Sequence, residues 1–236
     1  MKFLKENIKN YCTSFLENTK THLQKIYCNK KHLIVKITIF FVIGFIVCLA
    51  CFLMRNEILK ANSEQWSVIN GFLQIKITTN PGISFGSLAN SSSSVVYFIQ
   101  AIPVVIGIIV WVFSSNYLLD IGISLFFFGG LCNIIDRSLY DSFANNALFN
   151  WVQKENVVVD YFQFLPNSAI FNFADAFIII GIILIVIEIL ISWIKEYIAN
   201  KKEGNDKQLI KQEVLDEQRM QNKNKVKTIK LKKIKK

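Results

Sequence analysis

The chain has 236 residues, of which 52% are hydrophobic and 19% are charged, and its formal net charge is +10. This composition fits one soluble domain or a small multi-pass membrane protein, so the distribution of the apolar residues must decide. The charge alone would suggest a nucleic-acid partner. Most of the basic residues flank apolar segments, however, where they orient a membrane protein and attract anionic headgroups, so we expect no nucleic-acid partner. The five cysteines have no metal-ligand or disulfide spacing.

The N-terminal segment, residues 1–34, is basic and precedes an apolar stretch too long for a cleavable signal peptide. Apolar residues from Leu4 to Ile26 recur among the lysines at helical spacing. This pattern predicts an amphipathic helix on the cytoplasmic surface of a membrane.

Four apolar segments follow, and each approaches the roughly 20 helical residues that cross a bilayer. The expected spans are residues 37–54, 95–113, 118–135 and 174–194. The first two contain no charge, Asp120 interrupts the third, and Asp175 and Glu188 interrupt the fourth. The sequence therefore predicts a four-helix transmembrane domain over residues 35–195.

The basic residues predict the orientation of these spans. Of the 27 Lys and Arg residues, 8 precede the first span and 14 lie from Lys195 onward. The loops 55–94 and 136–173 hold only 3 and 2. Because cytoplasmic segments carry the Lys/Arg excess, both termini are expected in the cytoplasm and both long loops outside.

The outer loops contain strand-like segments. Residues 72–79 alternate apolar and polar side chains until Asn80-Pro81-Gly82 ends the pattern, and residues 157–162 are strand-like as well. The expected fold class is an all-α membrane protein with four transmembrane helices and a small extracytoplasmic β-rich element between helices 1 and 2. Residues 196–236 are too polar to form a core, so we expect a basic, disordered cytoplasmic tail.

Polar side chains, which are expensive inside a bilayer, gather at the outer ends of the third and fourth spans and in the second outer loop. Positions i, i+3 and i+4 of a helix share a face, which groups the polar residues of each span. The set consists of three carboxylates, two amides and one guanidinium: Asp136, Asp160, Asp175, Asn133, Asn172 and Arg137.

Carboxylates alone can hydrolyse a peptide. Two Asp side chains within about 3 Å cannot both ionise, so one keeps a proton. The ionised group can take a proton from water while the protonated one donates to the scissile carbonyl. A simpler alternative, a helix-end ion pair between Asp136 and Arg137, leaves Asp160 and Asp175 unexplained. Both histidines are expected on the cytoplasmic side, and the chain has no HExxH motif.

Four stretches resemble, in order, the motifs of the type II signal peptidases, the lipoprotein signal peptidases. They are Asn80-Pro-Gly-Ile-Ser-Phe-Gly, Gly129-Gly-Leu-Cys-Asn-Ile-Ile-Asp-Arg137, Val158-Val-Asp-Tyr-Phe162 and Phe171-Asn-Phe-Ala-Asp175 followed by Gly181. The resemblance covers about residues 35–195 and leaves both basic tails outside.

The resemblance implies a membrane-embedded aspartic endopeptidase of the cell membrane, with its active site at the extracytoplasmic face. Such enzymes remove signal peptides from diacylglyceryl-modified prolipoproteins, cleave just before the lipidated cysteine, use no metal or organic cofactor and are inhibited by globomycin. The expected partners are prolipoprotein substrates and membrane lipids. Asp160 and Asp175 would be catalytic. The residues implied to bind substrate, with Asp136 in support, are Asn80, Gly129, Asn133, Asp136, Arg137, Asn172 and Ala174.

One departure from the family pattern concerns the first catalytic position. Arg137 and Asp160 are separated by 22 residues, where the family has a handful, so residues 138–156 are expected to loop out as an insert. Asp141 lies in this insert and is a rival of Asp160. The preceding apolar run, residues 157–159, favours Asp160.

Two other classes of protein fit the sequence less well. A small transporter or ion-conducting subunit should place polar groups near the midplane of several spans. Beyond the outer cluster, the polar residues considered within the spans are Gln100, Asp120 and Glu188, and the last two fall toward the cytoplasmic side. An assembly scaffold would give no reason for carboxylates gathered at one boundary.

Overall fold

The structure, a computed structural model, describes residues 13–14, 16–17, 19–21, 23–24, 26–60, 63, 65–83, 86–139, 157–165 and 168–234. Four helices in this part of the chain are long and apolar enough to cross a membrane. They are α2 (Lys30–Lys60), α3 (Ser93–Phe113), α4 (Tyr117–Ser138) and α6 (Phe173–Ile234). Each predicted span lies within one of these helices, which confirms that the four predicted segments are helical and are long and apolar enough to cross a membrane. The described residues from Thr13 to Cys28 are helical too, as the amphipathic pattern predicts.

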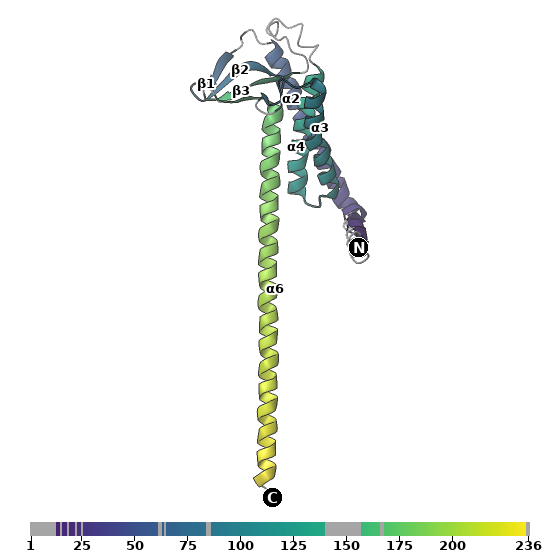
Figure 1. The fold of residues 1–236 in the computed structure, drawn as a ribbon, viewed down its shortest axis with the longest axis vertical. Coiled ribbons are helices and arrows are strands. Elements are labelled where there is room, and N and C mark those ends of the chain that lie inside the picture. The colour runs from purple at the N-terminus through teal and green to yellow at the C-terminus, as the bar shows by residue number, and fades with distance from the viewer. Residues whose placement is uncertain are drawn as a thin grey trace, which may run out of the picture. The chain divides into compact units, whose positions relative to one another are not determined.

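An antiparallel sheet lies at the end of the helices where α2 ends and α6 begins (Figure 1). Its strands, in the order β1-β2-β3-β4, are β1 (Gln65–Ile69), β2 (Leu73–Asn80), β3 (Val158–Phe164) and β4 (Ile170–Phe171). The predicted location of the β-rich element was incomplete, because β3 and β4 come from the loop between α4 and α6. A two-stranded hairpin is marginally stable alone, and the strand-like residues of the second loop provide the additional pairing.

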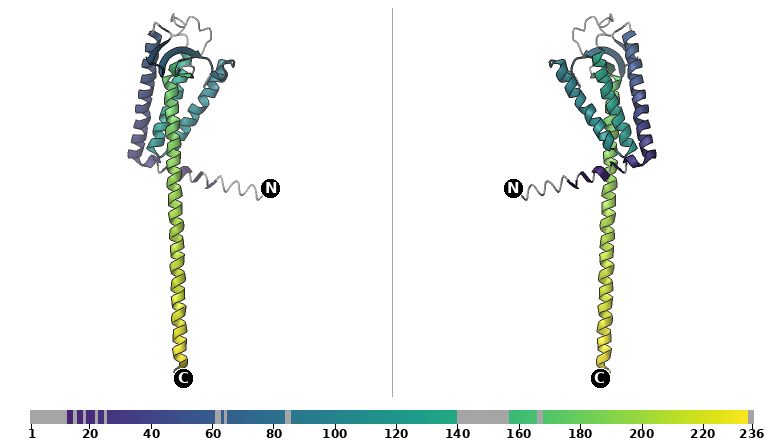
Figure 2. Two further views of the ribbon diagram at one scale, coloured as in Figure 1. Left: turned by 90° about the vertical axis from the view of Figure 1, so that its left-hand side faces the viewer. Right: turned by 90° about the vertical axis from the view of Figure 1, so that its right-hand side faces the viewer.

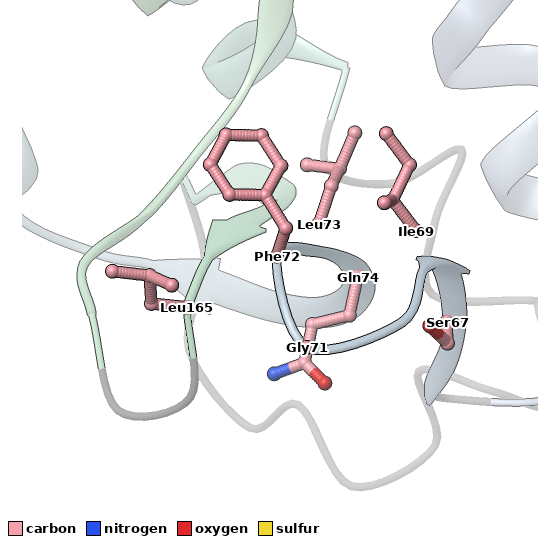
Figure 3. A pocket seen from close by; sticks show the side chains of 7 residues that line it. All are labelled: Ser67, Ile69, Gly71, Phe72, Leu73, Gln74 and Leu165. Carbon is pink, nitrogen blue, oxygen red and sulfur yellow. The ribbon is translucent and has the colours of Figure 1, made fainter.

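The turn between β1 and β2 contains Asn70 and Gly71, and Gly71 has φ +73°, a conformation that favours glycine. Next to this turn, the backbone N–H of Leu165 donates to the carbonyl of Phe72 at 2.8 Å. A pocket at this end of the sheet is lined by Ser67, Ile69, Gly71, Phe72, Leu73, Gln74 and Leu165 (Figure 3).

The sheet is fixed to the helices by an apolar cluster. Ile58 near the end of α2 packs with Ile75 and Ile77 of β2 and with Val159 and Tyr161 of β3, and all five are buried. Burying such side chains stabilises the contact by about 1.5–3 kcal/mol for each fully buried aliphatic residue. The cluster therefore holds β3, and with it Asp160, against the end of the helical bundle.

Helix α4 lies between α2 and α3 and contacts both (Figure 2). It also packs closely on the beginning of α6, because a Cβ atom added at Gly181 would lie 2.6 Å from the carbonyl oxygen of Gly122. Small residues let membrane helices approach in this way, and van der Waals packing then holds them together.

At the end of the bundle away from the sheet, a buried ion pair joins three helices. Nζ of Lys36 in α2 donates to the carbonyl oxygens of Trp111 and Ser114 at 2.5 Å each, at the end of α3. The same Nζ lies 3.6 Å from Oδ1 of Asp120 in the first turn of α4, and neither side chain is exposed. From the sequence alone, Lys36 was expected only to be a basic residue that flanks the first span.

The chain divides into two compact units, Met1–Val186 and Ile187–Lys236, and the sheet belongs to the first. In the second unit α6 continues to Ile234, so residues 196–234 are helical where the sequence predicted disorder. Lys, Glu, Gln and Leu have high helix propensity and no proline interrupts this stretch, which explains the helix.

The predicted domain boundaries stay predictions. Most of the predicted insert, together with Asp141, lies outside the described residues.

Candidate active site

The site is built around Asp160, which β3 places where the sheet meets α4 and α6. Its side chain is buried, with 4% of the residue exposed. The side-chain amide of Asn80, the last residue of β2, donates to Oδ2 of Asp160 at 3.2 Å. The amide of Asn172, just before α6, donates to Oδ1 at 2.9 Å. Two segments that are distant in sequence therefore supply donors to one carboxylate.

Asp175 lies in the first turn of α6 and exchanges hydrogen bonds with Asn172. The backbone N–H of Asp175 donates to Oδ1 of Asn172 at 2.9 Å, and the backbone N–H of Asn172 donates to Oδ2 of Asp175 at 3.2 Å. This reciprocal arrangement is that of a capping box, which satisfies N–H groups at a helix start. The hydrogen bonds at the start of α6 thus fix the position of the Asp175 carboxylate.

The two carboxylates belong to one hydrogen-bonded network. Nδ2 of Asn133 in α4 donates to Oδ1 of Asp175 at 2.8 Å, and Nδ2 of Asn172 donates to Oδ1 of Asn133 at 3.1 Å. Because Nδ2 of Asn172 also donates to Asp160, the amides of Asn172 and Asn133 connect the two acids. On the other face of β3, the hydroxyl of Tyr161 accepts from the backbone N–H of Phe173 at 3.1 Å and ties the strand to α6.

The network has the electrostatics of an acid–base pair. Burial, followed by the negative charge of Asp175, raises the pKa of Asp160 to about 7, although the amides of Asn80 and Asn172 oppose the shift. A carboxyl group with such a pKa can hold or release a proton near neutral pH.

Arg137 and Asp136, neighbours in the sequence, have different partners. Arg137 is 2% exposed, and its guanidinium donates to the carbonyl oxygens of Asn80 and Gly82. Asp136 accepts from Nη1 of Arg55 at the end of α2, at 2.7 Å. Both residues of the helix-end ion pair that was the simpler alternative thus have partners in other described segments of the chain.

Gly129 and Ala174 contact each other where α4 packs on α6. A Cβ atom at Gly129 would lie 2.7 Å from the carbonyl oxygen of Ala174, and Ala174 is buried in an apolar cluster with Val47 and Cys132. In this structure both residues serve helix packing, which brings Asn133 close to Asp175. Their contact with a substrate stays a prediction.

The pocket at the β1–β2 turn (Figure 3) is separate from this network. Leu73 pairs with Phe164 at one end of the β2–β3 ladder, and Asn80 pairs with Val158 at the other. At about 3.3 Å per residue, these ends lie roughly 23 Å apart. The seven lining residues include no titratable side chain, so the carboxylate network is the better candidate for catalysis.

Sequence reasoning missed the contributions of Arg55 and Gln100. Arg55 was counted only as one of three basic residues in an outer loop. Gln100, whose Oε1 accepts from Nε of Arg137 at 2.8 Å, was noted only as a polar residue within a span. Two signals could have identified these residues. Arg55 is one of the few basic residues in the outer loops, and Gln100 is an amide in a span without charge.

Comparison with known proteins gives concordant results. The sequence pattern of the family described as signal peptidase (SPase) II matches residues 43–191. A lipoprotein signal peptidase of Malacoplasma penetrans (strain HF-2) is 54% identical over 216 residues, which are 91% of this chain and 89% of that protein. A second lipoprotein signal peptidase, from Mycoplasmoides gallisepticum (strain R(low / passage 15 / clone 2)), is 40% identical over 72% of this chain and 55% of its own length.

The fold is similar to that of a solved bacterial membrane enzyme, with a TM-score of 0.53 and 26% sequence identity. The similarity covers 64% of this chain and 87% of that chain. Four spans and these matches define a multi-pass membrane enzyme of the peptidase class. Within that class, the chain belongs to the signal peptidase II family, the lipoprotein signal peptidases.

Proposed function

We propose that this protein is a membrane-embedded aspartic endopeptidase that removes signal peptides from diacylglyceryl-modified prolipoproteins, cleaving just before the lipidated cysteine. The observation that carries the proposal is the network in which Asn172 and Asn133 connect the carboxylates of Asp160 and Asp175. Membership of the signal peptidase II family supports the substrate class.

In the proposed mechanism the two carboxyl groups share one proton. The ionised carboxylate takes a proton from a water molecule, whose oxygen attacks the scissile carbonyl carbon, while the protonated carboxyl donates its proton to the carbonyl oxygen. Collapse of the tetrahedral gem-diol then expels the amine, which takes a proton from one carboxyl group. The other carboxylate takes back a hydroxyl proton as the carbonyl re-forms, so the pair again holds one proton. The fixed amides of Asn80, Asn133 and Asn172 hold both acids in position, so little reorganisation is needed during the reaction.

The substrate site is proposed to include Asn80, Gly129, Asn133, Asp136, Arg137, Asn172 and Ala174. The network lies where the spans meet the sheet, and a site at such a boundary suits a substrate whose diacylglyceryl group stays in the bilayer. Membrane lipids are accordingly the proposed surroundings of both enzyme and substrate.

The direct test is cleavage of a diacylglyceryl-modified precursor by the purified protein. Asp160→Ala should abolish cleavage, because it removes one of the two connected carboxylates. Asp141→Ala should retain substantial activity, because that residue lacks the apolar Val157–Val159 context. The cleaved peptide is quantified by mass spectrometry, with globomycin as an inhibition control. Equal loss of activity in both variants would contradict the assignment of Asp160.

The proposed orientation places both termini in the cytoplasm and the carboxylate network at the extracytoplasmic face of the cell membrane. We expect a cysteine introduced by Ser91→Cys to react with a membrane-impermeant reagent in intact cells. A cysteine introduced by Lys223→Cys should react only after lysis, because 22 of the 27 basic residues lie in the two terminal segments. Native cysteines are replaced beforehand, and labelling is read on gels. The reverse labelling pattern would overturn the orientation.

A further inference from the structure

Arg137 is held by acceptors from two other parts of the protein. Its Nη1 donates to the carbonyl oxygen of Asn80 at 3.2 Å, and its Nη2 donates to that of Gly82. Its Nε donates to Oε1 of Gln100 in α3 at 2.8 Å. The planar guanidinium therefore connects the turn after β2 to a transmembrane helix, and the direction of each N–H group follows from the plane.

Arg137 contacts a turn, residues 80–82, that orients the side-chain amide of Asn80. Within this turn the backbone N–H of Gly82 donates to Oδ1 of Asn80 at 3.0 Å, and Nδ2 of Asn80 donates to the carbonyl oxygen of Ile83 at 3.3 Å and to Oδ2 of Asp160 at 3.2 Å. The turn is closely packed, since a Cβ atom at Gly82 would lie 2.1 Å from the carbonyl oxygen of Ser87. A guanidinium bonded to the carbonyls at both ends of the turn thus fixes a donor to Asp160.

Gln100 of α3 contributes to the orientation of this guanidinium. No charged residue occurs in α3, and an amide in an apolar span is costly unless it is hydrogen-bonded. The bond from Nε of Arg137 satisfies the oxygen of Gln100 and fixes the guanidinium plane, so that both Nη atoms meet the carbonyls of the turn.

We propose that Gln100 is a positioning residue of the peptidase site, which acts through Arg137 and the Asn80–Gly82 turn on the carboxylate of Asp160. The inference rests on the proposed function, because it takes Asp160 to be one of the two reacting acids. It assigns to Arg137 a role in building the site in addition to any contact with substrate.

Loss of Gln100 is expected to change the pKa of Asp160. The hydrogen bond from Asn80 favours the ionised carboxylate, so weakening it raises the pKa of Asp160 further. The charged groups that act on Asp160 are Asp175 on α6, which raises its pKa, and Arg137 on α4, which lowers it. Displacing Arg137 would also raise the pKa of Asp160, in the same direction as weakening the hydrogen bond from Asn80. The pH-rate profile should therefore move to higher pH.

The test compares Gln100→Met, which keeps the side-chain length but lacks the acceptor, with Gln100→Glu, which retains an acceptor for Nε. We expect Gln100→Met to lower kcat about tenfold with little change in KM, as for the loss of a hydrogen bond to a charged group. Its pH profile should shift upward, and Gln100→Glu should recover most of kcat. Gln24→Met, at an exposed helical position, is the matched control.

Wild-type kcat and an unshifted pH profile in Gln100→Met would overturn the proposal. Equal losses in Gln100→Met and Gln100→Glu would also overturn it, because they would show that the helix tolerates no change at this position. Failure of the proposed function is distinguishable, since it would appear as retained cleavage in variants that lack the Asp160 or Asp175 carboxylate.

Discussion

Asp160→Asn and Asp175→Asn should each reduce the rate of precursor cleavage by several orders of magnitude. General acid–base catalysis alone contributes about 10²–10⁴, and each substitution removes one of the two ionisable groups that must share a proton. Binding of the precursor should largely survive, because Asn keeps the shape of the side chain. The double variant should lose little more than either single variant, since the acids act as one unit.

The pH dependence of the wild-type rate follows from the same pair. In the proposed mechanism the pair holds one proton, and Asp160, whose pKa is raised to about 7 by burial and by the negative charge of Asp175, releases it as the pH passes that value. Above that pH the pair has no general acid, so the rate should fall as the pH rises through about 7.

Single-turnover rates and binding of uncleaved precursor measure these effects, and Glu57→Gln, at an exposed carboxylate, is the control. Retained cleavage in a folded Asp175→Asn protein would exclude the aspartic mechanism. Asp136 cannot replace the missing carboxylate of Asp175, because Asp136 is paired with Arg55.

Lys36→Met should destabilise the protein by about 3–5 kcal/mol, because it leaves the buried carboxylate of Asp120 without its ionic partner. The substitution also removes the donor to the carbonyls of Trp111 and Ser114 at the end of α3. Cleavage by the molecules that remain folded should change little, because the pair lies at the end of the bundle away from the sheet. Thermal or denaturant unfolding in detergent micelles measures the effect.

The double variant Lys36→Met/Asp120→Leu should recover much of this stability, since replacing a whole buried ion pair by apolar residues is often neutral or stabilising. Lys60→Met is the matched control, because Lys60 pairs with Glu57 on the exposed surface, at 2.9 Å. Exposed pairs contribute about 0–1 kcal/mol. A double variant as unstable as Lys36→Met would show that the ion pair itself is not the source of the stability.

The four spans could be predicted from the sequence because a bilayer imposes a local requirement. Every backbone group must be bonded within its own helix, and about 20 apolar residues are needed in succession. The same requirement makes polar residues such as Asn133 and Asp175 conspicuous. The reciprocal bonds between Asn172 and Asp175 are equally local, since they join residues three positions apart.

The sequence by itself therefore determined the spans, the strand segments and the residue types gathered near one boundary. Only the tertiary structure decided that β3 joins the β1–β2 hairpin, that Asp136 pairs with Arg55 and that Arg137 binds the Asn80–Gly82 turn. The physical reason is distance along the chain. A periodic pattern shows which face of a helix is polar, but the partner that meets this face comes from another segment, and the packing of the helices and the sheet selects it.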